Sequence, residues 1–351
     1  MSMRSLPYLS ALLVSGSVLA LPPLPEPVSN NAVASTTVRG KTYVVSMMGM
    51  GPGKTAQDMH NKVWMHTIGE FGWKSLAEVP SQTRVSGRVA ASAVALNNNF
   101  FVLGGYSVDR QGNRVTSVES YRFNPATERY NRVNDMPVPV DDSLTLTYQD
   151  RYIFLVGGWN GDGAVNLVQV FDNFTQKWSQ ATPMPGKAVY GLAGAIVNNH
   201  LIFCDGVSLD YQTGQRVKTT EPSCYQGTID QRDAHTIAWK PIPHPTGQAR
   251  FRMAAIDSTV DGKDVAVFIG GSRVFYHHSG ISEQAEPAQP EPNVWVYSPE
   301  QEQWLDAEPT EAIMDLQGLI KIDDEIYSLG GMRQNQRVTS ELIKHTIRLN
   351  N

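Results

Sequence analysis

The stretch Phe154-Leu155-Val156-Gly157-Gly158 decides the fold, because short apolar segments that end in a glycine pair recur along the chain. The other complete copies are Phe101–Gly105, Val267–Gly271 and Tyr327–Gly331. Two degenerate copies are Ser46–Met50 and Ile202–Gly206. Successive copies lie about 48 to 65 residues apart, and a period near 50 residues indicates a repeat in which each unit is one small β-sheet.

A second landmark follows each of the first five glycine segments: an aromatic residue a few positions before a proline. The pairs are Trp73 with Pro80, Tyr130 with Pro137, Trp178 with Pro185, Trp239 with Pro243, and Trp304 with Pro309. An alternating segment such as Val168–Phe171 usually precedes the aromatic residue. Each unit therefore predicts four strands: an inner strand, the strand before the glycines, the alternating strand and an outer strand. Such units stack radially and close into a ring.

These glycine pairs and aromatic residues resemble the kelch family over essentially all of residues 21–351. The resemblance implies an all-β, six-bladed kelch-type β-propeller. The sixth unit has an alternating segment near Leu342–Leu349 and then no outer strand. Leu21-Pro22-Pro23-Leu24-Pro25 resembles the end of an outer strand, as in Met136-Pro137 and Met184-Pro185. We therefore expect the N-terminal strand to complete the last blade and close the ring.

The first 20 residues are typical of a signal peptide. Arg4 supplies a positive charge, Leu6–Leu19 is mostly apolar, and Val18-Leu19-Ala20 places small residues where a signal peptidase cleaves. The apolar run is shorter than the roughly 20 residues that cross a bilayer, which argues against the alternative of a short membrane anchor. We predict a signal peptide over 1–20, a propeller domain over 21–351, a periplasmic or secreted location, and no membrane insertion after cleavage.

Charge and cysteine content limit the partners. The net charge of −5 and the pI of about 5.9 argue against nucleic acid, which needs a basic face. Cys204 and Cys224 either form a disulfide in an oxidising compartment or remain free thiols, and the sequence leaves both open. No histidine lies at a zinc-ligand spacing from them, so we expect no metal and no cofactor.

Within the kelch family, the chain resembles the periplasmic N-acetylneuraminate (sialic acid) mutarotases, also called epimerases. The resemblance rests on the signal peptide, the single six-bladed propeller, the Leu-Pro-rich segment after residue 20, and a long fifth-blade loop, Ser272–Pro292. It implies an isomerase that acts on a sialic-acid-like sugar bearing a carboxylate. The alternative is a non-catalytic kelch propeller that binds a glycan or a protein partner.

The same resemblance implies a catalytic glutamate directly after the fourth glycine segment and an arginine a few residues later. Val207 occupies the glutamate position, and Arg216 is the candidate arginine at a longer spacing. The identity of the general acid or base therefore stays open.

Counting back from the glycine pairs locates residues that enter the channel mouth. The spacing selects Arg88, Asp141 and Arg252, and an uncertainty of one residue adds Asp142, Tyr190 and Asp315. Residues shortly after the glycine pairs are Tyr106, Trp159, Arg273 and Arg333. We expect Arg88, Arg252, Arg273 and Arg333 to converge on a carboxylate, since guanidinium groups bind carboxylates through two hydrogen bonds.

The remaining candidates supply stacking and proton transfer. Tyr106, Trp159 and Tyr190 are candidates to stack on a sugar ring, and Asp141, His277 and Arg216 are the candidate catalytic residues. Asp142 and His278 are the neighbouring alternatives. Structural roles stay open beside these: Arg88 can bind loop carbonyls, Asp141 can cap a turn, and His277 can lie in solvent.

Overall fold

Six β-sheets surround a central channel in the computed structural model, which describes residues 21–82, 87–212 and 215–350. The described residues form strands, turns and two short 3₁₀ helices, Ala56–Asp58 and Gln334–Gln336, with no α-helix among them. The predicted all-β, six-bladed propeller is confirmed. The predicted signal peptide, residues 1–20, lies outside the described part of the chain. No helix within that described part is long and apolar enough to cross a membrane.

Five of the six sheets contain an inner, two middle and one outer strand. Blade one consists of β1 (Ala32–Val38), β2 (Lys41–Met50), β3 (Met59–Thr67) and β4 (Lys74–Leu76). Blade two consists of β5 (Val89–Leu96), β6 (Asn99–Val108), β8 (Ser120–Asn124) and β9 (Arg129–Arg132). Blade three consists of β10 (Leu144–Tyr148), β11 (Tyr152–Val156), β12 (Val168–Asp172) and β13 (Lys177–Gln180).

The remaining blades follow the same order. Blade four consists of β14 (Ala193–Val197), β15 (His200–Cys204), β18 (Cys224–Ile229) and β19 (Ile237–Ile242). Blade five consists of β20 (Ala254–Val260), β21 (Lys263–Ile269), β22 (Trp295–Ser298) and β23 (Gln303–Leu305). Blade six consists of β24 (Ile320–Ile322), β25 (Glu325–Leu329) and β28 (Leu342–His345).

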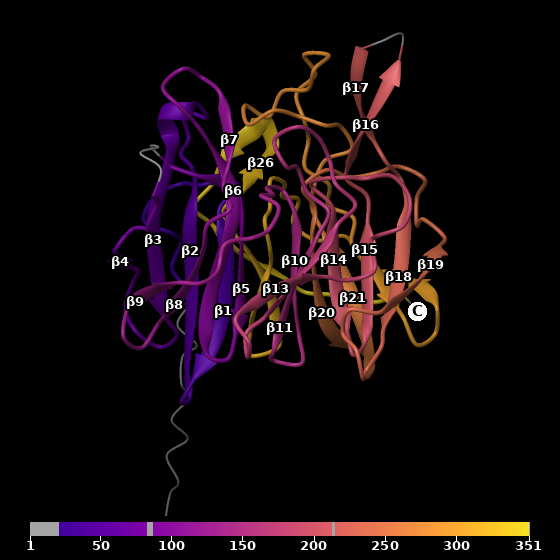
Figure 1. The fold of residues 1–351 in the computed structure, drawn as a ribbon, viewed down its shortest axis with the longest axis horizontal. Coiled ribbons are helices and arrows are strands. Elements are labelled where there is room, and N and C mark those ends of the chain that lie inside the picture. The colour runs from indigo at the N-terminus through magenta and orange to yellow at the C-terminus, as the bar shows by residue number, and fades with distance from the viewer. Residues whose placement is uncertain (1–20, 83–86, 213–214, 351) are drawn as a thin grey trace, which may run out of the picture.

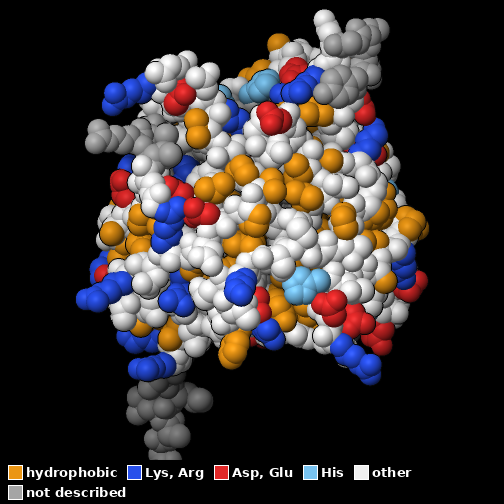
Figure 2. Space-filling view, in the orientation of Figure 1, with side chains coloured by type: hydrophobic (Ala, Val, Ile, Leu, Met, Phe, Trp, Pro, Cys, Tyr) orange, Lys and Arg blue, Asp and Glu red, His pale blue; other side chains and the backbone are white. Residues whose placement is uncertain are grey.

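Short extra strands extend the chain beyond the glycine pairs. They are β7 (Arg114–Thr116), which pairs with β6, the hairpin β16 (Val207–Gln212) and β17 (Gln215–Thr220), and the hairpin β26 (Met332–Arg333) and β27 (Arg337–Val338). Figure 1 shows β7, β16, β17 and β26 together at the upper end of the sheets. In Figure 2, hydrophobic side chains are spread across the middle of this outer face, and charged side chains of both signs gather towards its rims. The loops that could form a site therefore lie at one end of the channel.

The glycine pair works through backbone conformation and close approach. Gly157 and Gly158 have φ angles of 62° and 103°, a region that L side chains rarely adopt. A Cβ atom on Gly157 would lie 2.8 Å from the Val189 carbonyl oxygen of the next blade. A side chain here would separate two blades, so the pair is required where neighbouring sheets meet.

The outer aromatic residues join each blade to the preceding one. Trp178 packs against Phe171 with ring centroids 5.2 Å apart, and its Nε1–H donates to the Asn134 carbonyl oxygen of blade two at 2.8 Å. Trp304 and Trp73 donate in the same way to Pro243 and Pro22. The aromatic landmark is thus both an apolar plug and a hydrogen-bond donor between blades.

Blade six has three strands among the described residues. The segment before β1 lies against it, because Leu24 N–H donates to Ser340 O at 2.8 Å and Val28 N–H donates to Thr339 O at 3.1 Å. Leu24 also packs in one apolar cluster with Leu329. The segment is not a strand of this sheet in residues 21–31, so completion of the blade by an N-terminal strand stays a prediction.

The two cysteines form a disulfide. Cys204 ends β15, Cys224 begins β18, and the two residues lie directly opposite each other in blade four. The alternative of free thiols is wrong for this structure. A disulfide in a kelch blade is consistent with an oxidising, extracytoplasmic compartment.

Candidate functional site

A ring of six equivalent residues begins the inner strands at the upper end of the channel. They are Asn30, Ala90, Asp142, Gly191, Arg252 and Asp315, with φ angles of 56°, 55°, 48°, 66°, 51° and 64°. Neighbouring members are linked, since Asp142 N–H donates to Ala90 O at 3.0 Å and Gly191 N–H donates to Asp142 O at 2.7 Å. The ring shows which residue of each blade faces the channel: Asp142, Arg252 and Asp315 do. Arg88 and Asp141 come before the ring positions of their own blades.

Arg252 closes the centre of this ring. Its Nε–H and one terminal N–H donate to the two carboxylate oxygens of Asp142, both at 2.9 Å, and its other terminal nitrogen lies 2.7 Å from Asp315 Oδ1. The residue is 6% exposed. Burial opposes its charge, but the carboxylates of Asp142 and Asp315 raise the pKa of Arg252 well above its ordinary value. The buried Arg252 side chain is therefore positively charged, and the carboxylates of Asp142 and Asp315 already balance that charge.

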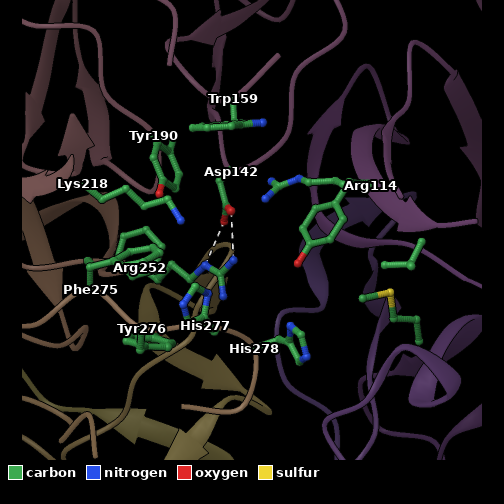
Figure 3. A pocket seen from close by; sticks show the side chains of 14 residues that line it. Arg114, Asp142, Trp159, Tyr190, Lys218, Arg252, Phe275, Tyr276, His277 and His278 are labelled. Carbon is green, nitrogen blue, oxygen red and sulfur yellow. Dashed lines mark hydrogen bonds and ion pairs between the residues drawn. The ribbon is translucent and has the colours of Figure 1, made fainter. Parts of the chain in front are cut away.

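A cavity of about 220 Å³ lies directly above Arg252 (Figure 3). Its lining comes from β6 and β7, from the residues after the glycine pairs, from β17 and from the fifth-blade loop. The lining residues are Met59, Tyr106, Val108, Arg114, Asp142, Trp159, Tyr190, Lys218, Phe251, Arg252, Phe275, Tyr276, His277 and His278. Such a concave site with many aromatic and few charged groups is typical of small-molecule binding.

Arg114 occupies one wall of the cavity. Its guanidinium carbon lies 3.7 Å from the centre of the Tyr106 ring, and its NH2 group donates to Asp141 Oδ1. Thr116 Oγ1 donates to the other oxygen of Asp141 at 2.9 Å. Burial raises the pKa of Asp141, and Asp141 in turn raises the pKa of Arg114 against the opposing effect of burial. Asp141 therefore fixes the guanidinium of Arg114, and the Arg114 side chain lines the cavity.

The wall that continues from Arg114 through Trp159 is aromatic. Trp159 and Tyr190 meet edge to face with ring centroids 5.2 Å apart, and Phe275 lies 6.2 Å from Tyr190. Lys218 Nζ lies 4.7 Å from the centre of the Phe275 ring and 3.2 Å from Glu283 Oε1. Aromatic faces of this kind bind the apolar faces of sugar rings.

His277 and His278 lie on the side of the cavity formed by the fifth-blade loop (Figure 3). Burial is the largest effect on both, and it lowers the pKa of each imidazole. Lys218 lowers the pKa of His277 further, and Arg252 lowers that of His278. Uncharged imidazoles at neutral pH can accept a proton from a ligand hydroxyl.

Comparisons with known proteins agree with this architecture. The Kelch motif profile matches residues 144–185, which span blade three. A solved structure titled "Structure of YjhT" superposes with a TM-score of 0.71 at 13% identity, covering 94% of this chain and 99% of the other. The chain is a kelch-repeat β-propeller. At this identity, the similarity to YjhT shows the fold alone.

The chain is also similar to two curated proteins, one from human and one from rat. Kelch-like protein 15 of Homo sapiens is 24% identical over 255 residues, which cover 71% of this chain and 40% of that protein. Kelch-like protein 36 of Rattus norvegicus is 27% identical over 253 residues, which cover 71% of this chain and 37% of that protein. The chain thus spans about 40% of the length of these relatives.

The expected convergence of four arginines is wrong. Of the four, Arg252 lines the cavity, whereas Arg88 is buried between blades and donates to Gly104 O at 3.1 Å and Pro80 O at 3.2 Å. Arg273 pairs with Glu291 at 2.8 Å, and Arg333 pairs with Glu311. The reason is the alternation of side chains along a strand: Ser272 and Met332 occupy the positions equivalent to Trp159, so the next residue points away.

Two of the three candidate catalytic residues also lie elsewhere. Asp141 is fully buried behind Arg114 and holds that arginine and Thr116, so it has no access to a ligand. Arg216 is an exposed residue of β17 that donates to Asp162 O at 2.9 Å and does not line the cavity. His277 does line it, together with the predicted Tyr106, Trp159 and Tyr190.

Sequence reasoning missed Arg114, Lys218 and Phe275. A signal for Arg114 exists: Tyr106-Ser107-Val108 and Arg114-Val115-Thr116 flank the turn Asp109–Asn113, in which the Asp109 carboxylate accepts hydrogen bonds from the backbone N–H groups of Gln111 and Asn113. This pattern predicts a hairpin beyond the glycine pair. Lys218 lies on a comparable hairpin, whose direction over the cavity depends on tertiary packing.

One group of possible metal ligands lies outside the cavity: Asp205, Cys224 and His244. Cys224 is in the disulfide, and Asp205 accepts hydrogen bonds from His244 Nε2 at 2.7 Å and from Arg250 N–H at 2.7 Å. His244 Nδ1 accepts from Gly247 N–H at 2.7 Å, which leaves the proton on Nε2. These donors are occupied by structural bonds and do not fit a metal site.

Proposed function

We propose that this kelch propeller binds an anionic sugar in the cavity above Arg252 and catalyses the interconversion of its anomers. The observation that carries the proposal is an aromatic wall, Trp159 and Tyr190, that shares one cavity with the imidazole of His277, whose pKa burial lowers. The ring of a sugar can stack on the aromatic wall while its hydroxyl groups meet the imidazole. The resemblance to sialic acid mutarotases supports the same substrate class.

Mutarotation needs only proton transfer. A base removes the proton of the anomeric hydroxyl, an acid protonates the ring oxygen, the ring C–O bond breaks, and the open form closes on its other face. We assign the first proton transfer to His277, which lines the cavity. We assign protonation of the ring oxygen to Tyr190, which also lines the cavity; burial raises the pKa of its hydroxyl group, so that group carries a proton. Reclosure returns both protons, so no cofactor is consumed.

Anomer exchange can be followed directly by NMR. Freshly dissolved α-N-acetylneuraminate is mixed with the protein, and the growth of the β-anomer signal is compared with the buffer rate. The proposal expects faster equilibration, lost in His277→Gln and kept in Arg273→Gln, whose side chain lies outside the cavity. An unchanged equilibration rate with the wild-type protein would contradict it.

A second candidate function is sugar binding without catalysis. Val207, at the position where the resemblance implies a glutamate, is buried in one apolar cluster with Tyr190 and Phe251. It offers no proton. Binding of the sugar, measured by calorimetry, without faster exchange would favour this function. If a protein partner binds at the same channel mouth, free sugar should compete with that partner and release it.

We also propose that residues 1–20 are removed as a signal peptide, that residues 21–351 form the periplasmic or secreted propeller, and that the N-terminal segment completes blade six. The Cys204–Cys224 disulfide and the Leu24 hydrogen bond to Ser340 support this. N-terminal sequencing of the exported protein tests it, and a chain that retains residues 1–20 would contradict it.

A further inference from the structure

Three cations line the cavity, and their bonds differ. Arg252 is 6% exposed and donates to the carboxylates of Asp142 and Asp315 through three hydrogen bonds. A ligand carboxylate would have to displace one of these buried carboxylates. Because that exchange leaves a buried charge unpaired, Arg252 is unsuited to recognise a ligand.

Lys218 is a weaker candidate for recognition. Its Nζ lies 3.2 Å from Glu283 Oε1 and above the Phe275 ring, so its charge is shared with the fifth-blade loop. An ammonium group also acts as a point charge, with none of the planar geometry that matches a carboxylate. It raises the positive potential of the cavity without selecting a particular group.

Arg114 differs from both. Its side chain is 34% exposed, it lies flat on Tyr106, and its guanidinium carbon is 5.5 Å from the centre of the Trp159 ring. Among the described residues, its one hydrogen bond to Asp141 uses a single terminal nitrogen, NH2. This nitrogen carries a second N–H group, and together with a neighbouring nitrogen of the guanidinium it can bind a second carboxylate through two parallel hydrogen bonds.

The residues behind Arg114 are fixed. The Asp141 backbone N–H donates to Trp159 O at 2.9 Å, and the Trp159 N–H donates to Asp141 O at 2.8 Å. Thr116 Oγ1 holds the second oxygen of the Asp141 carboxylate. One backbone pair thus carries both the acid that orients Arg114 and the indole beside it.

We propose that Arg114 is the residue that recognises the carboxylate of the anionic sugar, and that Asp141 and Thr116 are positioning residues for it. The inference rests on the proposed function for the class of ligand, a sugar, and adds the residue that selects the charged member of that class. Arg252 instead belongs to the floor of the site.

Paired ligands that differ in charge test the inference by calorimetry. The probes are N-acetylneuraminate with its methyl ester, and glucuronate with glucose, so that two sources of a sugar carboxylate are compared. The selectivity is the ratio of the Kd of the neutral probe to the Kd of the acid. The variants are Arg114→Gln, Arg114→Lys, Lys218→Gln in the same cavity, and Arg273→Gln outside it.

We expect Arg114→Gln to lower the selectivity about ten- to a hundred-fold, the loss that follows from removing charged hydrogen bonds, with little change for the neutral probe. Arg114→Lys should restore a small part of it, because a point charge replaces a planar fork. Lys218→Gln should change the ratio by less than about three-fold, and Arg273→Gln should leave it unchanged. Equal losses for acid and neutral probe, or a larger loss in Lys218→Gln, would overturn the inference.

The positioning role has its own readout. Asp141→Asn keeps an acceptor for Arg114 but removes the charge, and Thr116→Val removes the hydrogen bond that orients Asp141. Both should lower the selectivity and leave the affinity for the methyl ester within about two-fold. A loss for both probes, or no loss for either, would contradict a positioning role.

The two proposals fail in different ways. Carboxylate selectivity that depends on Arg114 without faster anomer exchange would remove the catalytic function and keep this inference. Faster exchange that is indifferent to Arg114→Gln would keep the function and remove the inference. Wild-type protein that binds none of the four probes would remove both.

Discussion

Arg252 and Asp142, 110 positions apart in the chain, form a buried ion pair in which two guanidinium nitrogens each lie 2.9 Å from a carboxylate oxygen. The pair joins blade five to blade three and passes blade four, whose ring position is Gly191. A Cβ atom on Gly191 would lie 2.2 Å from the Phe251 ring. The missing side chain makes room for the Phe251 ring, and Asp315 extends the same network to blade six.

Arg252→Ala should destabilise the propeller by about 3 to 5 kcal/mol, because it leaves the buried carboxylates of Asp142 and Asp315 without their cation. Urea unfolding followed by tryptophan fluorescence measures the difference. Arg273→Ala is the matched control: its side chain is 51% exposed, and we expect a change below about 1 kcal/mol. Equal midpoints for Arg252→Ala and wild type would show that the network does not hold the ring.

His345 should make the fold sensitive to acid. Its imidazole is buried between Ser328 and Thr310, and burial lowers its pKa to about 4, against about 6.5 in the unfolded chain. Between these pH values the unfolded chain binds a proton that the folded protein does not. As the pH is lowered from 6.5 to 4, the free energy of unfolding should therefore fall by up to about 1.4 kcal/mol for each pH unit.

This acid effect is read as a difference between two proteins, since many carboxylates titrate over the same range. Unfolding free energies of wild type and His345→Gln are measured from pH 7 to pH 4. Between pH 6.5 and pH 4, the unfolding free energy of wild type should fall more than that of His345→Gln. Parallel curves would exclude a contribution from His345.

The Cys204–Cys224 disulfide should stabilise blade four. It closes a loop between residues 20 positions apart, for which the loss of chain entropy in the unfolded state corresponds to about 3 kcal/mol. Urea unfolding of the oxidised protein and of Cys204→Ser/Cys224→Ser gives the difference. A double variant as stable as the oxidised protein would mean that strand pairing alone sets the stability of this blade.

His277→Gln and Arg114→Gln should separate catalysis from recognition. Loss of a general base slows a proton transfer by about 10²- to 10⁴-fold, so His277→Gln should slow the catalysed anomer exchange while the sugar still binds. Arg114→Gln should raise the concentration of N-acetylneuraminate needed for half-maximal rate. Exchange NMR over a range of sugar concentrations checks both. Identical effects of the two variants would contradict the division of roles.

Much of the site could be predicted from the sequence. The glycine pairs located Tyr106 and Trp159, and the spacing back from them located Tyr190 and Arg252, all of which line the cavity. Arg273 and Arg333 were misplaced by one residue of register, which on a strand reverses the direction of a side chain. Asp141 is one position before the channel-facing Asp142, and it is buried behind Arg114.

The repeat determined the architecture by itself, because a blade is defined by local patterns: a glycine pair, an alternating strand and an outer aromatic residue, all within about 50 residues. The tertiary structure alone decided which charges are available. Arg252 is neutralised by residues 110 and 63 positions away, whereas Arg114 reaches the cavity from a hairpin and keeps donors unused by Asp141. Charge pairing depends on distances between side chains of different blades, and no local pattern in the chain records those distances.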